Sequence, residues 1–229
     1  MALTKVIGAG VGNLDELGVG TASPSYKVHS VTTSGSDYAG FFHNSSGSGN
    51  GTSLVVKGGA NNTGAGTFIV QDYSGNTDLM VDGNGHVTMP NQSAFLVNPS
   101  STQTNLTVND WNTIAFGTER FDQNADFASN TFTSPVTGRY QFNLFAYLKQ
   151  INHGYSLVQV ALQTSNLSYR WTYDFRYGDH NADYMPLTFS TLADMDANDI
   201  AYIRIYVPNY GSAQMDFDAE SWFSGYLVC

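Results

Sequence analysis

Cysteine, charge and long apolar runs are all scarce in this sequence, and each shortage excludes a class of protein. Cys229 is the single cysteine, so no disulfide can join two parts of the chain. We expect Cys229 to be a terminal residue without a role; a disulfide between two chains is the alternative. Charged residues make up 12% of the 229 positions, about half of the usual share of about 25%. No run of about 18 apolar residues occurs and no basic, apolar leader precedes the chain, so we expect neither membrane insertion nor a signal peptide.

The charge that is present is unbalanced towards acid. Nineteen Asp and Glu residues stand against nine Lys and Arg residues, which gives a net charge of −10. Such a field repels nucleic acid, and no local cluster of Lys and Arg offsets it. We therefore expect no nucleic-acid partner.

Aromatic residues and glycine are plentiful. Aromatic residues reach 14% and there are 23 glycines, while no segment keeps an apolar period of 3.6 residues. Aromatic and β-branched side chains pack well on a pleated surface. The sequence therefore predicts an all-β protein.

The two parts of the chain differ in composition near Met89-Pro90-Asn91. Residues 1–90 are rich in Gly, Ser, Asn and Thr and contain no Trp, whereas residues 91–229 hold all three Trp. Proline interrupts strand pairing and suits a junction. We predict an attachment or junction segment at 1–24, a β-structured stalk at 25–90 and a globular knob at 91–229.

A weak repeat of short apolar strands and polar turns runs through the predicted stalk. Apolar triplets at 54–56, 68–70 and 79–81 are each followed by a turn rich in Gly, Asn or Asp, and 40–44 resembles a degraded copy. Strands this short cannot bury a core within one chain, so neighbours must cover them. Three identical chains around one axis would do so; a flexible linker is the alternative.

Strict alternation marks the strands of the predicted knob. In 140–148 the even positions are apolar, and the opposite face carries Phe145 and Tyr147. In 200–207 an aliphatic face is opposed by a face with Tyr202 and Tyr206. Because aromatic residues are enriched where subunits meet, we predict a trimer interface at these four residues of a β-sandwich.

Two motifs stand out in the predicted knob: residues 132–142 read F-x-x-P-x-x-G-x-Y-x-F, and 222–227 read W-F-S-G-Y-L. The first matches the signature of the globular head of complement C1q, a trimeric jelly roll of the tumour-necrosis-factor-like class, and the second resembles the terminal strand of that family. Residues 93–97 are similar to its opening strand, and 197–200 stand where that family keeps x-G-D-x-V. The resemblance implies a jelly-roll β-sandwich that forms a homotrimer.

Two motifs stand out in the predicted stalk: residues 18–29 read GVGTASPSYKVH, and 79–87 read LMVDGNGHV. The first is similar to the GIGT-x-SPSYKLHV junction of phage tail-fibre and adhesin stalks, and the second to their L-x-V-D-G-x-G-x-V hairpin. Residues 1–5 resemble the opening of short phage fibre proteins. The resemblance implies a virion location, on a head or tail fibre, with other virion proteins bound through the N-terminus.

No motif of catalysis is complete. The Gly-rich run at 5–12 lacks the last glycine of a dinucleotide fingerprint, because Asn13 stands there, and no Gly-x-Ser-x-Gly elbow occurs. The five histidines have no zinc spacing. We expect neither an enzyme nor a cofactor, although Asp194, Asp196 and Asp199 offer oxygen ligands that calcium accepts, with a polar turn as the alternative.

The segment after residue 169 combines flat rings with planar polar groups. Rings stack on the C–H faces of sugars, while carboxylates, amides and imidazoles bind hydroxyls. An ordinary exposed loop is the alternative. The predicted receptor-binding residues are Tyr177, Asp179, His180, Asn181, Asp183 and Tyr184.

These features together predict a homotrimeric phage fibre protein whose knob binds a host-surface receptor, a glycan or an outer-membrane molecule. A purely structural fibre or decoration protein is one alternative. A depolymerase carried on a fibre is another, for which Asp174, Asp179 and Asp183 are the available carboxylates.

Overall fold

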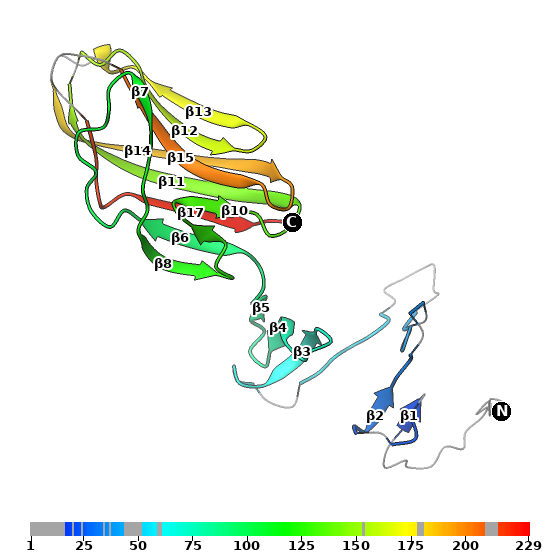
Figure 1. Cartoon of the computed structure of the whole chain (residues 1–229). Helices are drawn as coiled ribbons and strands as arrows, with labels where there is room; N and C mark the ends of the chain where they lie inside the picture. Colours follow the sequence, from blue (N-terminus) through cyan, green and yellow to red (C-terminus); the bar gives the residue numbers. More distant parts are fainter. Residues whose placement is uncertain are drawn as a thin grey trace. The chain divides into compact units, whose positions relative to one another are not determined.

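The chain divides into two compact units, residues 1–59 and 60–229, in the computed structural model (Figure 1). The structure describes residues 17–19, 21–23, 25–33, 35–36, 38–43, 52–58, 61–152, 154–177, 181–208 and 215–229. The boundary between the units falls inside the predicted stalk, so the predicted division at 24 and 90 stays a prediction. In the described residues the only helix is one 3-10 turn, η1 (Phe175–Tyr177), and no helix is long and apolar enough to cross a bilayer.

The first unit contains one described pair of strands. β1 (Leu17–Val19) pairs in parallel with β2 (Val28–Ser30). The apolar triplet at 54–56 forms no strand, and Val55 is 78% exposed, so the repeat prediction is wrong there for the single chain. The physical reason is that a single chain has no apolar surface that could cover this triplet, so a strand here would need neighbouring chains.

A three-stranded antiparallel sheet opens the second unit. It consists of β3 (Gly66–Gln71), β4 (Thr77–Asp82) and β5 (Val87–Thr88). The apolar triplets at 68–70 and 79–81 lie in β3 and β4, so this part of the predicted repeat is confirmed. The side chains of Phe68, Ile69 and Val70 are nevertheless each more than 40% exposed.

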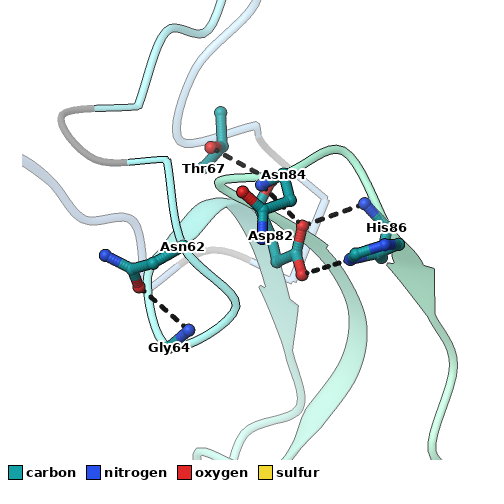
Figure 2. A network of polar contacts seen from close by, with 6 residues as sticks. All are labelled: Asn62, Gly64, Thr67, Asp82, Asn84 and His86. Atoms are coloured by element: carbon teal, nitrogen blue, oxygen red, sulfur yellow. Dashed lines mark hydrogen bonds and ion pairs between the residues drawn. The ribbon is translucent and has the colours of Figure 1, made fainter.

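The turns after β3 and β4 have the same construction. In the first, Asp72 accepts hydrogen bonds through Oδ1 from the amides of Ser74 and Asn76, and through Oδ2 from the Asn76 side chain. In the second, Asp82 accepts in the same way from the amides of Asn84 and His86, and its Oδ2 lies 2.8 Å from His86 Nδ1 (Figure 2).

Glycine occupies the fourth position of both turns because the backbone there is left-handed. Gly75 has a φ of 86° and Gly85 a φ of 88°, values at which a side chain would be strained. The hydrogen bonds to the carboxylate lower the pKa of both aspartates, most strongly through Asn76 for Asp72 and through His86 for Asp82. The sequence repeat is therefore a repeat of one turn.

The rest of the second unit is a sandwich of two antiparallel sheets that lie face to face (Figure 1). Sheet one has the order β14-β11-β17-β6-β8, with β16 added to β11. Its strands are β6 (Ala94–Asn98), β8 (Thr118–Gln123), β11 (Gly138–Ile151), β14 (Ala182–Met195), β16 (Asp216–Phe217) and β17 (Trp222–Leu227).

Sheet two has the order β13-β12-β15-β10-β9, with β7 added to β15. Its strands are β7 (Asp110–Thr113), β9 (Phe127–Ala128), β10 (Thr131–Thr133), β12 (Val158–Thr164), β13 (Ser168–Tyr173) and β15 (Ile200–Val207). The all-β prediction and the strands predicted from alternation are confirmed, because the even positions of 140–148 are buried while the odd ones are not.

An aromatic core fills the space between the sheets. The ring of Phe95 stacks on Phe127 and Phe132, each with centroids 5.0 Å apart, and meets Phe223 edge-on at 5.1 Å. Phe142 stacks on Phe223 at 5.9 Å. All five rings are at most 3% exposed, and such pairs add to the free energy gained by burial alone.

Candidate functional site

A row of stacked aromatic rings crosses the outer side of sheet one, and we call it the aromatic face. Tyr184 of β14 stacks on Tyr147 of β11 with centroids 5.4 Å apart. Tyr147 stacks on Phe145 at 6.0 Å, and Phe145 on Trp222 of β17 at 6.2 Å. These residues alternate with buried core residues along their strands, which places them on the side of the sheet away from the core.

The centre of the same outer surface is polar but uncharged. Gln141 donates a hydrogen bond of 2.7 Å to Ser190 Oγ, which donates one of 2.9 Å to Asn143 Oδ1. The uncharged outward positions near this network are Tyr147, Pro186, Thr188, Leu192, Ser224, Tyr226, Ala94 and Leu96. The charged pair of Arg139 and Asp194 lies at the end of this surface, towards the start of β11. Depletion of charge is typical of the centre of a protein interface.

The aromatic face continues into an open hollow of about 720 Å³. Trp222, Leu96 and Phe121 line it, and the ring of Phe121 is 51% exposed. Arg120 lies at the rim and donates a hydrogen bond of 2.9 Å from Nε to Asn98 Oδ1. Its mainly apolar lining suits contact with an apolar side chain of another molecule.

A second, smaller hollow of about 230 Å³ lies where β11 ends and β14 begins. Its polar lining comes from Gln150 and Asn152 on one side and from Asn181 and Asp183 on the other. The pairing of Ile151 with Ala182 brings these two segments together. We call this site the polar hollow; its amides and carboxylate are the groups that bind sugar hydroxyls.

An ion pair supports the strand between the two sites. The Lys149 ammonium contacts the Asp218 carboxylate, which is 5% exposed, and lies 5.3 Å from the centre of the Tyr184 ring. Burial acts to raise the pKa of Asp218, but the ammonium of Lys149, the Glu220 amide and the Thr102 hydroxyl together lower it. The same contact raises the pKa of Lys149.

The C1q domain model matches residues 94–228, more than half of the chain. The chain belongs to the C1q domain family. The predicted jelly-roll resemblance is thereby confirmed for the knob, and domains of this class commonly form trimers. No curated protein matches the sequence as a relative.

Solved structures similar to this C1q domain include the globular domain of zebrafish complement 1qA protein. It is 18% identical, with a TM-score of 0.45, and the match covers 60% of this chain and 98% of that domain. Two crystal structures of murine APRIL, at pH 8.0 and pH 8.5, are each 10% identical with a TM-score of 0.43, over 60% of this chain and 99% of theirs. Family membership rests on the sequence match, because these identities are low.

The C1q domain separates the four residues predicted for the trimer interface into two groups. Phe145 and Tyr147 belong to the aromatic face of sheet one. Tyr202 and Tyr206 alternate with the buried residues of β15, so they point outward from sheet two, on the other side of the sandwich. Alternation along a strand reveals that a face is outward, but only strand pairing decides which sheet carries it.

The predicted receptor-binding residues are placed only in part. Asp179 and His180 lie outside the described residues, and Tyr177 ends η1. Asn181 and Asp183 line the polar hollow, and Tyr184 begins the aromatic face. The sequence analysis missed Gln150 and Asn152, because they precede Asn181 and Asp183 by about thirty positions. The only local signal is a pair of amide side chains at the end of a strand.

Asp174, one of the carboxylates considered for catalysis, is held by its neighbour. The guanidinium of Arg176 binds the carboxylate, with 2.9 Å between Nε and Oδ1, and the Arg176 amide adds a bond of 3.0 Å. These contacts lower the pKa of Asp174 to about 2. Asp174 therefore stabilises the η1 turn, and it stays ionised at neutral pH.

The three aspartates predicted to bind calcium do not gather into one site. Asp199 accepts hydrogen bonds from the Asn166 side chain and the Asp196 amide, while Asp194 lies 3.9 Å from Arg139. In the described part of the chain, no three acidic, histidine or cysteine side chains are arranged to hold a metal ion. The 195–199 segment instead forms a polar turn, closed by a bond of 3.0 Å from the Asp199 amide to the Asp196 carbonyl.

Proposed function

We propose that this chain is one subunit of a homotrimeric phage fibre, that its C1q domain binds a glycan on the host surface, and that it has no enzymatic activity. The observation that carries the trimer is the aromatic face with its adjoining hollow. A face of stacked rings and uncharged polar groups gains free energy when a second molecule covers it. Domains of the same class commonly form trimers.

The polar hollow is the proposed receptor site. Three amide side chains and the carboxylate of Asp183 line it, and one of the amides, Gln150, also donates a hydrogen bond to Asp216. This combination suits a sugar, since amides and carboxylates bind hydroxyls. Three such sites on one trimer raise the effective affinity through avidity without any new contact.

The fibre context is supported by the predicted stalk. Its resemblance to phage stalks lies in 18–29 and 79–87, and the second of these segments contains the Asp82 turn. The exposed apolar residues of β3 fit a segment that is covered only when three chains wind together. A virion location and contacts of the N-terminus with other virion proteins belong to the same proposal.

The native mass of the full chain tests the trimer. Light scattering after gel filtration should give about 74 kDa, three times the chain mass of 24.8 kDa. A stable monomer at micromolar concentration would contradict the proposal, because both the stalk and the aromatic face would then be left uncovered.

Binding of the full chain to host-cell polysaccharide tests the receptor site. Asn181→Ala and Asp183→Ala should each reduce binding about tenfold, since each removes hydrogen bonds to the sugar. Asn166→Ala, in a turn of the C1q domain outside the lining of the polar hollow, is the control. No binding by the trimeric wild type would favour a purely structural fibre, and release of reducing sugar would favour a depolymerase.

A further inference from the structure

The outer side of sheet two carries two arginines that both contact one tryptophan. Arg170 of β13 and Arg204 of β15 both pair in register with Ala161 of β12, so they stand in one row across three strands. Trp111 of β7 contacts both guanidinium groups: its ring centre is 4.5 Å from the Arg204 guanidinium carbon and 5.3 Å from that of Arg170. Ala161 has no exposed surface although it points outward, because these larger side chains cover it.

Neither arginine forms an ion pair with a described residue, although Asp and Glu outnumber Lys and Arg in the chain. The net charge is −10, yet in the described part of the chain neither Arg170 nor Arg204 has a carboxylate within ion-pair distance. Both guanidinium groups reach the same hydroxyl, since Arg170 Nε lies 3.1 Å and Arg204 Nη2 lies 3.5 Å from Ser168 Oγ. The like charges therefore lie within a Debye length of one another and repel. An anion between them would relieve that repulsion.

The hydrogen bonds of the cluster leave donors available. Arg170 Nε donates to Ser168 Oγ at 3.1 Å, and no described residue accepts from its terminal nitrogens. Arg204 donates from Nη2 to Gln163 Oε1 at 2.6 Å, and its buried Nε has no partner among the described residues. A guanidinium presents a fork of donors that matches a carboxylate.

Flat rings and amides surround the charged row. Tyr206 packs beside Trp111 with centroids 5.7 Å apart, and it pairs in register with Gln159. On the other side of the row, Tyr202 pairs with Gln163. Trp111, Tyr202 and Tyr206 are partly exposed. Aromatic rings stack on the C–H faces of sugar rings, while amides bind their hydroxyls, so the surface suits a saccharide better than a free anion.

We propose that this surface, formed by Trp111, Arg170, Arg204 and Tyr206, binds an acidic saccharide through the carboxylate of a uronic acid. The site goes beyond the proposed receptor site, since it lies on the other sheet and needs none of the residues of the polar hollow. A trimer formed through the aromatic face of sheet one leaves sheet two outward, so three copies would be displayed together.

Calorimetric titration of the full chain with trigalacturonate tests the site. The wild type should bind, binding should weaken as salt rises, and the carboxyl-reduced trisaccharide should bind at least tenfold more weakly. Arg170→Gln should lower the affinity about tenfold while leaving the melting temperature unchanged, because the side chain is exposed and makes a single described hydrogen bond.

Two further variants distinguish this site from a general effect of net charge and from the polar hollow. Arg139→Gln removes an exposed arginine from sheet one, with the same change in net charge, and should bind trigalacturonate as the wild type does. Asn181→Ala should also leave this binding unchanged, because Asn181 lines the polar hollow on the other sheet. Absent binding at millimolar trigalacturonate, equal binding of the neutral trisaccharide, or an unaffected Arg170→Gln would each overturn the proposal.

Discussion

Phe142 and Gly225 face one another on the neighbouring strands β11 and β17, and the glycine leaves the space that the ring of Phe142 occupies. A Cβ at position 225 would lie 2.7 Å from Cδ1 of Phe142 and 2.7 Å from Cε1 of Phe95. Both rings belong to the core and are at most 1% exposed, so neither can move aside cheaply. The glycine of the terminal W-F-S-G-Y-L motif is therefore required by packing.

Gly225→Ala should destabilise the C1q domain by about 1–3 kcal/mol, the usual cost of overpacking a core. Urea unfolding followed by tryptophan fluorescence measures the loss. Ser224→Ala, one position away and on the outward side of the same strand, is the control and should change the free energy of unfolding by less than about 0.5 kcal/mol. Equal stability of Gly225→Ala and the wild type would show that the two rings can separate.

Phe145→Arg should break the trimer without unfolding the subunit. The substitution places a charge in the middle of the aromatic face, where a neighbouring subunit would have to bury it unpaired. We expect the native mass to fall towards the 24.8 kDa of one chain. Thr172→Arg, at an exposed outward position of sheet two, is the control and should leave the native mass unchanged. If both variants remained trimers, the aromatic face could not be the interface.

Stability should fall in acid because the pKa of Asp218 is lower in the folded state than in the unfolded chain. Such a carboxylate stabilises the fold fully above its unfolded pKa, about 3.9, and the contribution is lost as the pH falls through the folded value. The raised pKa of Lys149 has the opposite sign: its contribution is present below about pH 10.4 and is lost as the pH rises above that value.

Lys149→Met tests this linkage. It leaves the buried Asp218 carboxylate without its cation, so we expect the variant to unfold at a lower urea concentration than the wild type at pH 7. The loss should be smaller near pH 4, because burial without the cation raises the pKa of Asp218 in the variant and lets the carboxylate become protonated there. Arg139→Met removes an exposed pair whose side chains are 59% and 80% exposed, and should cost less than about 0.5 kcal/mol at either pH. A loss that does not depend on pH would show that the effect comes from packing.

The turn at Asp82 should tolerate asparagine in place of His86, because the turn at Asp72 has Asn76 at the equivalent position. Asn76 and His86 occupy equivalent places and both contact the aspartate Oδ2, at 2.9 Å and 2.8 Å. His86→Asn should therefore leave the backbone amide at position 86 as protected against hydrogen exchange as in the wild type. His86→Ala should reduce the protection of that amide several-fold. Asn76→His is the reciprocal test, and loss of protection in both conservative exchanges would mean that the two turns are not equivalent.

The sequence alone determined the strictly alternating strands and the family of the globular part, whereas it did not predict β14, whose first residues were expected to form a loop. Alternation in 140–148 and 200–207 separates buried from outward positions, because the pleat points successive side chains to opposite faces. The glycines of the C1q signature are equally local signals: a Cβ at Gly138 would lie 2.7 Å from the Cys229 carbonyl oxygen, and one at Gly225 would strike the core rings. The turn motifs at Asp72 and Asp82 are encoded within five residues each.

Only the tertiary structure decided which outward residues share a surface. Phe145 and Tyr206 look alike in the sequence, as aromatic residues opposite an apolar face, yet they belong to different sheets. Gln150 meets Asn181 through the pairing of β11 with β14, and Arg170 meets Arg204 through β12, although each pair is separated by about thirty residues. Strand order follows from the packing of the whole core, and local periodicity carries no information about it.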